Sequence, residues 1–95
     1  MRVIGFRKLR EFFGSYPDAE ISLSAWYKLA RRANWQNLAE VKQTYSHANL
    51  VGDYSVFNLR GNNYRLVVRI NFRTGVIYVK GVFSHAEYDK GAWKT

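Results

Sequence analysis

The segment from Ser84 to Gly91 holds a dense group of side chains that can carry a proton: His85, Glu87, Tyr88 and Asp89 fall within a few positions of one another. Imidazole, carboxyl and phenol groups are the usual general acids and bases of enzymes. We expect His85 to be the first choice for acid or base. Tyr88 is the second, because a phenol, with an ordinary pKa of about 10, must be shifted before it accepts a proton efficiently.

Two further residues have less certain roles. Glu87 could orient His85, or it could simply cap a short terminal helix. The other histidine of the chain, His47, lies in the polar stretch 46–49 and is a much weaker candidate. A lone histidine is more often structural than catalytic, so the case for His85 depends on what lies beside it.

A run of alternating residues from Tyr54 to about Phe83 predicts the strands that precede this segment. The turn-forming residues 60–63 and 73–75 divide the run into strands near 54–60, 64–72 and 76–83. In the middle strand, apolar residues alternate with Arg65, Val67, Arg69 and Asn71. One face of the sheet is therefore predicted to be apolar and the other basic.

A two-residue hairpin at Thr74 and Gly75 would fix the register of the last two strands. It pairs Phe72 with Ile77, Ile70 with Val79, Val68 with Gly81 and Leu66 with Phe83, so apolar residues meet on one face. On the other face it sets Arg69 opposite Lys80, Asn71 opposite Tyr78 and Arg65 opposite Ser84. Like charges directly opposed destabilise a sheet by up to about 1 kcal/mol, and a bound anion would relieve them.

The basic face has aromatic and amide neighbours and no acidic ones. Tyr54, Val56 and Asn58 of the first strand share it, and the basic residues between positions 54 and 86 are Arg60, Arg65, Arg69, Arg73 and Lys80, with no Asp or Glu among them. Guanidinium groups hold phosphates in bidentate fashion, and rings beside them stack on unpaired bases. This pattern favours single-stranded RNA over duplex DNA. The alternative is an ordinary solvated sheet face.

The N-terminal half is predicted to be helical. Apolar spacings of three and four indicate helices over about 6–13 and 18–33, and Asn37 with Glu40 resembles a capping box that begins a third. Residues 1–4 could add an edge strand. The expected fold class is α+β, with N-terminal helices packed on one face of a small twisted antiparallel sheet and a short C-terminal helix or tail.

Composition agrees with a polyanion-binding protein. Fifteen Lys and Arg against seven Asp and Glu give a formal charge of +8, which favours nucleic acid as partner, although basicity could instead serve solubility or an acidic protein partner. The absence of cysteine excludes disulfides, thiolate zinc sites and cysteine nucleophiles. The first residues contain no apolar run of a signal peptide or membrane helix. We therefore expect one cytoplasmic domain over residues 1–95.

Three stretches of the sequence resemble the HigB-type mRNA interferase toxins of bacterial toxin-antitoxin pairs, and the likeness extends over nearly the whole chain. They are Ser84-His85-Ala86-Glu87-Tyr88-Asp89-Lys90, Tyr64-Arg65-Leu66-Val67-Val68 and Ala25-Trp26-Tyr27. The family pattern reads Thr-His-x-Glu-Tyr-Asp-Lys, so Ser84 replaces a threonine. An arginine is common where Lys80 stands, and lysine lacks its bidentate fork.

The resemblance implies a RelE-type fold, cleavage of messenger RNA on the translating ribosome, and inactivation by a small helix-turn-helix antitoxin of the HigA kind. The chemistry would be attack of a ribose 2′-hydroxyl on the adjacent phosphate, which needs a base, an acid and cations but no metal or cofactor. We expect Arg65 and Lys80 to act on the scissile phosphate, together with His85 and Tyr88. The predicted RNA-binding residues are Arg60, Arg69, Arg73, Lys90, Tyr54 and Tyr78.

Two other functions are compatible with the same residues. A toxin of this fold could act by binding, for instance on gyrase, without RNA chemistry. The chain could also be a non-enzymatic module that docks on RNA or the ribosome, in which case the C-terminal His, Glu and Tyr would be incidental.

Overall fold

The computed structural model describes residues 1–59 and 63–94. The elements follow in the order β1 (Arg2–Ile4), α1 (Phe6–Ser15), a 3-10 turn (Pro17–Ala19), α2 (Glu20–Arg32), α3 (Leu38–Thr44), β2 (Asn49–Val51), β3 (Tyr54–Leu59), β4 (Tyr64–Asn71), β5 (Val76–Ser84), α4 (His85–Lys90) and a second 3-10 turn (Ala92–Lys94).

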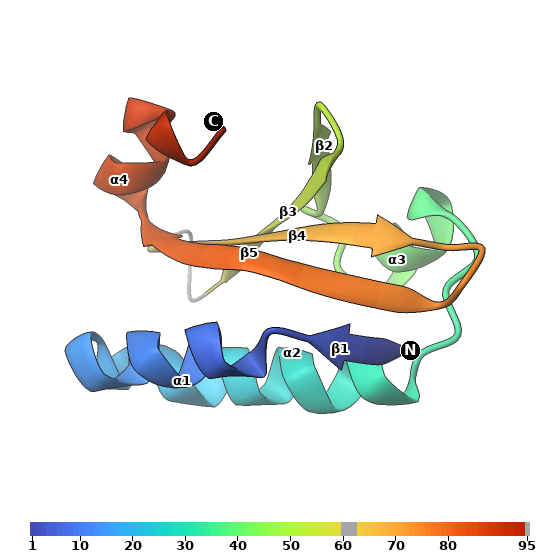
Figure 1. The fold of residues 1–95 in the computed structure, drawn as a ribbon, viewed down its shortest axis with the longest axis horizontal. Helices are drawn as coiled ribbons and strands as arrows, with labels where there is room; N and C mark the ends of the chain where they lie inside the picture. The colour runs from blue at the N-terminus through green and yellow to red at the C-terminus, as the bar shows by residue number, and fades with distance from the viewer. Residues whose placement is uncertain (60–62, 95) are drawn as a thin grey trace.

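The strands form one sheet in the order β1-β5-β4-β3-β2. Helices α1 and α2 lie against one face, and α4 with the C-terminal turn stands on the other (Figure 1). The predicted α+β class and the N-terminal edge strand are confirmed. The sheet is mixed rather than purely antiparallel, because β1 runs parallel to β5. Strand β2, which pairs with β3, was not predicted, since its three residues are too few to show an alternation.

The helices are close to their predicted limits. The second one begins as a 3-10 turn at Pro17, because proline fixes φ and suits a first helical turn. The capping box predicted for α3 is only half present: Asn37 accepts a hydrogen bond from the Glu40 N–H, but the Glu40 carboxylate accepts from the N–H of Gln36 instead.

The main core lies between the sheet and the helices α1, α2 and α3. Trp26 is fully buried, and its ring meets Phe57 edge to face at 5.5 Å. Leu66 and Val68 of β4 point into the same cluster, as their alternation predicts. Burial of apolar side chains on this scale is the main stabilising contribution to a domain of this size.

The predicted register of β4 and β5 is wrong. The loop between them spans residues 72–75, not two residues, because the Asn71 carbonyl accepts from the Gly75 N–H and the Asn71 side chain accepts from the Thr74 N–H. The observed pairs next to the loop are Asn71 with Val76, Ile70 with Ile77, Arg69 with Tyr78 and Val68 with Val79. Arg69 therefore faces Tyr78, and the opposed like charges predicted for Arg69 and Lys80 do not exist as a cross-strand pair.

A β-bulge between Val67 and Val68 changes the register again and leaves Lys80 as the extra residue of β5. Beyond it the pairs are Val67 with Gly81, Leu66 with Val82, Arg65 with Phe83 and Tyr64 with Ser84. Val82, rather than Gly81 and Phe83, therefore belongs to the main core. A bulge reverses the alternation of faces, and periodicity alone does not reveal it. Most of the predicted turn 60–63 lies outside the described residues.

Candidate functional site

The face of the sheet turned away from α1 and α2, called the outer face below, is partly covered rather than open. A small second cluster is buried there, formed by Val56, Val67 and Trp93. Partly buried residues pack around it, among them Tyr54, Phe83 and Tyr88. The C-terminal segment thus covers one part of the face that the sequence predicted to be basic.

Arg65 lies on this face in a desolvated position. Its exposed fraction is 8%, and its guanidinium lies over the ring of Tyr88, 5.5 Å from the centroid. On the neighbouring strand, Asn58 is its cross-strand partner. A cation above an aromatic face is attracted by the ring quadrupole, and removal of water strengthens that attraction. Arg65 is therefore a preorganised positive group and not a mobile surface charge.

Tyr88 is held in place by the local structure of the C-terminal segment. Its ring stacks on Trp93 with centroids 5.0 Å apart and an angle of 15° between the planes. The Trp93 Nε1–H donates to the Tyr88 carbonyl at 3.0 Å. Helix α4 ends at Gly91, whose φ of 73° is the left-handed conformation that glycine accommodates best. These contacts fix the tyrosine ring above Arg65.

A depression of about 330 Å³ opens beside this pair. We call it the Arg65 depression; its lining residues are Lys42, Ser46, His47, Ala48, Asn49, Val56, Asn58, Arg65 and Tyr88. The described residues that line it include two permanent cations and several hydrogen-bonding groups, and none of them is acidic. Such a surface suits a phosphate, which offers negative charge and several acceptor oxygens.

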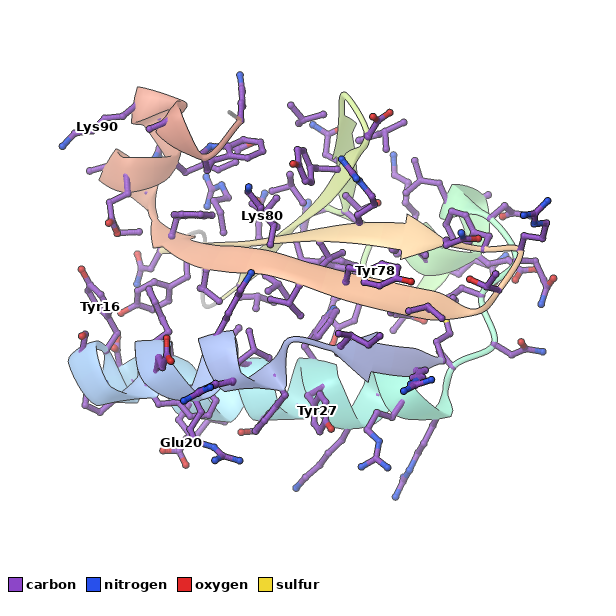
Figure 2. The ribbon with its side chains drawn as sticks, in the orientation of Figure 1. Tyr16, Glu20, Tyr27, Tyr78, Lys80 and Lys90 are labelled. Atoms are coloured by element: carbon purple, nitrogen blue, oxygen red, sulfur yellow. The ribbon has the colours of Figure 1, made fainter. Side chains whose placement is uncertain are left out.

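A second depression of about 410 Å³ lies elsewhere on the outer face and reaches the edge of β5. It is lined by Lys8, Tyr54, Arg69, Tyr78, Val79 and Lys80. The Arg69 guanidinium lies 5.1 Å from the centroid of the Tyr54 ring. Figure 2 shows Lys80 rising from β5 toward the side that carries α4. Arg69 and Lys80 thus share a depression although they are not a cross-strand pair.

Lys8, one of the cations of the second depression, is anchored at the bulge. Lys8 of α1 donates from Nζ to the Val79 carbonyl at 3.3 Å and to the Lys80 carbonyl at 3.4 Å. An irregular strand leaves backbone carbonyl groups without a hydrogen-bond donor from the neighbouring strand, and a lysine ammonium can donate to them. The bulge that upset the predicted register therefore helps to bring Lys8, Lys80 and Arg69 into one depression.

His85 is the first residue of α4, and its Nδ1 lies 3.0 Å from a carboxylate oxygen of Asp89, one turn along the helix. Both side chains are more than half exposed, at 55% and 61%. His85 does not line either depression. The acid or base role predicted for it stays a prediction.

Glu87 caps the helix that begins at His85. Its Oε1 accepts from the backbone N–H of Ser84 at 3.2 Å and from the Ser84 hydroxyl at 3.0 Å, while the Glu87 N–H donates to the Ser84 Oγ. This is a complete capping box. Of the two roles predicted for Glu87, the structure shows the cap, and Asp89 is the carboxylate beside His85.

Two of the remaining predicted RNA-binding residues, Arg73 and Lys90, do not line either depression. Arg73 is exposed in the loop between β4 and β5. Lys90 is exposed at the end of α4 and points away from the sheet (Figure 2). Arg60 lies outside the described residues.

The sequence pattern did not bring Lys42 or residues 46–49 to the Arg65 depression, and it left His47 as only a weak candidate. Lys42 comes from α3, and His47 comes from the turn between α3 and β2. The missing signal was strand β2: Asn49 pairs with Val56, and that pairing draws the preceding turn to the edge of the outer face. Without β2, residues 46–49 look like an unattached polar loop.

Residues 1–59 and 63–94 contain neither a cluster of metal-ligating side chains nor a membrane-spanning helix. Nowhere in these ranges do three or more potential metal-ligating His, Asp or Glu side chains gather. No helix there has the length and apolar character that a membrane crossing requires.

Comparison with known proteins agrees with this arrangement. Residues 19–91 match the HigB toxin family, described as the RelE-like toxic component of a toxin-antitoxin system. The chain is also 26% identical over 93 residues to "mRNA interferase HigB" of Escherichia coli O6:H1, an alignment that covers 95% of this chain and 90% of that protein. The family match spans α2, α3, the strands β2 to β5 and α4, and so includes the Arg65–Tyr88 pair. The chain belongs to the HigB family of RelE-like toxins.

Proposed function

We propose that this protein is an endoribonuclease that cleaves messenger RNA on the translating ribosome and so arrests translation. The relative from Escherichia coli carries the name mRNA interferase, which supports RNA as the substrate. The net charge of +8 favours a polyanion as partner. The two cationic and aromatic depressions on the outer face are complementary to an unpaired RNA strand.

The proposed reaction is an internal transfer at phosphorus. A ribose 2′-oxygen attacks the adjacent phosphorus as its proton passes to a base, and the bond from phosphorus to the 5′-oxygen breaks as an acid protonates that oxygen. The products are a 2′,3′-cyclic phosphate and a 5′-hydroxyl. The chemistry needs no redox partner and no group that the chain lacks.

The roles of the side chains follow from their positions. Arg65 binds the scissile phosphate and stabilises the negative charge that develops on its oxygens. Lys80 assists, and Arg69 and Tyr78 bind the neighbouring nucleotide in the second depression. Tyr88, which contacts Arg65, is an acid or base for the reaction. His85, on the same helix as Tyr88, is the other candidate for proton transfer.

One observation carries this proposal: an arginine that is almost completely desolvated, held over the ring of Tyr88, lines a depression with no acidic residue among its described lining residues. A phosphate bound in the depression would accept charge-assisted hydrogen bonds from this preorganised guanidinium.

The biological setting is part of the proposal. A helix-turn-helix antitoxin, of the HigA kind, would inhibit the protein in the cytoplasm, where the messenger and the ribosome are. Such an antitoxin must cover the outer face or prevent its approach to the ribosome.

The test compares the wild-type protein with Arg65→Ala and, as a matched control, Arg31→Ala. Arg31 is an exposed arginine of α2, whose helix packs on the other face of the sheet. We expect Arg65→Ala to lower the rate of messenger cleavage on programmed ribosomes by about 100-fold or more, because it removes a charged group aimed at the transition state. Arg31→Ala should cleave at the wild-type rate. Circular dichroism and urea unfolding establish that both variants fold.

Two outcomes would reject the proposal. Cells that stop growing with intact messenger would favour a toxin that acts by binding, for instance on gyrase. Binding to programmed ribosomes without cleavage would favour a non-enzymatic module.

A further inference from the structure

We infer that His47, which the family resemblance does not include, supplies the base for this reaction from the turn between α3 and β2. The inference rests on the proposed function and assigns one residue within it. The inference is drawn from the fact that His47, Arg65 and Tyr88 line the same depression. These residues come from a turn, a strand and a helix that are far apart in the sequence.

The turn that carries His47 is fixed on both sides. The ring of Tyr45 meets Phe57 of the main core edge to face at 5.4 Å. Burial raises the pKa of the Tyr45 phenol, so this ring remains neutral. Ala48 is buried, and its N–H donates to the Tyr45 carbonyl at 2.9 Å. His47 itself is exposed between these anchors, so its imidazole can reach a ligand without opening the fold.

The groups around His47 agree with a site for RNA. Lys42 of α3 and Arg65 of β4 are positive, while Ser46, Asn49 and Asn58 offer hydrogen bonds. Tyr88 is the remaining ionisable residue that lines the depression, and no Asp or Glu occurs among its described lining residues. A phosphate bound there has cations beside it and two proton-transferring side chains within the same depression.

Ordinary acid and base strengths divide the two roles. An imidazole is the side chain that changes charge near neutral pH, so it can take up a proton there. A phenol, with an ordinary pKa of about 10, still carries its proton at neutral pH and can donate it. His47 therefore accepts the proton of the 2′-hydroxyl as the new bond from oxygen to phosphorus forms. Tyr88 donates a proton to the 5′-oxygen as its bond to phosphorus breaks.

The experiment measures single-turnover cleavage of messenger on programmed ribosomes by wild type, His47→Ala and Gln43→Ala. Gln43 is an exposed residue of α3 that does not line the Arg65 depression, and it serves as the matched control. We expect His47→Ala to cleave about 100-fold more slowly, within the range of general acid-base catalysis, and Gln43→Ala to cleave like wild type.

Two further readouts separate proton transfer from a structural role. Added imidazole should restore part of the activity of His47→Ala, because the position is exposed, and it should leave wild type and Arg65→Ala unchanged. The wild-type rate should fall toward acid pH, because a protonated imidazole no longer accepts a proton. His47→Ala should lack that fall.

The outcomes distinguish this inference from the proposed function. Wild-type cleavage by His47→Ala, together with loss of cleavage by Arg65→Ala, overturns the inference and leaves the endoribonuclease proposal standing. A slow His47→Ala variant that imidazole does not rescue, with an unchanged pH profile, also overturns the role as base. If wild type does not cleave RNA at all, both proposals fail.

Discussion

Buried aromatic side chains lie on both faces of the sheet, but the groups around them differ. Toward the helices, Trp26 and Phe57 pack on each other and on further apolar residues of the main core. On the outer face, Tyr88 and Trp93 stack on each other, and the cation of Arg65 lies over the tyrosine ring. Both arrangements exclude water, but only the first avoids the cost of desolvating a charge.

The difference separates stability from function. A sheet selected for stability alone would cover its second face with apolar residues or leave its arginines in water. Here β4 alternates between the two environments, so Leu66 supports the core while its neighbour Arg65 is presented to the outer face. The main core fixes the strand, and the strand in turn positions the cation.

We expect the largest effect on the free energy of unfolding at the face of the sheet that packs against the helices. Trp26→Ala removes a fully buried ring and should lower the free energy of unfolding by about 3–5 kcal/mol, as measured by urea denaturation. Ile21→Ala, on the same helix but with 82% of the side chain exposed, is the control and should change it by less than about 0.5 kcal/mol. Equal effects at the two positions would contradict the assignment of the core.

A smaller effect is expected where the outer face depends on α4. Ser84→Ala removes the hydroxyl of the capping box and should cost about 1 kcal/mol in unfolding free energy. It should also slow messenger cleavage, because α4 holds Tyr88 over Arg65. Ser84→Thr keeps the hydroxyl and should preserve both properties. Unchanged cleavage by Ser84→Ala, at the predicted loss of stability, would show that α4 does not position the site.

Much of the fold could be predicted from local pattern. The alternation of Leu66 and Val68 with Arg65 and Arg69 depends only on the pleat of a strand, so the apolar and basic faces of β4 were predicted correctly. The partners of those residues could not be. The Asn71 side chain closes a longer loop, and the bulge at Lys80 reverses the faces of β5.

The candidate site was predictable only in part, for a related reason. Arg65, Tyr88, Arg69 and Lys80 were identified from residue type and family likeness. That Arg65 lies under Tyr88 depends on how the C-terminal segment folds back over the sheet, through the contact of Trp93 with Tyr88. That His47 reaches the same depression depends on β2, whose three residues carry no readable period.

The most direct test of the central claim asks which face of the molecule touches RNA. A photo-crosslinking p-azidophenylalanine replaces Tyr78, in the second depression, or Ile21, on the exposed side of α2. Each protein is bound to ribosomes programmed with a messenger whose riboses carry 2′-O-methyl groups and cannot be cleaved. Position 21 is the more exposed of the two, at 82% against 45% for Tyr78, so exposure alone favours the control. We predict crosslinks to the messenger from position 78 and none from position 21; crosslinks from position 21 alone would contradict the account.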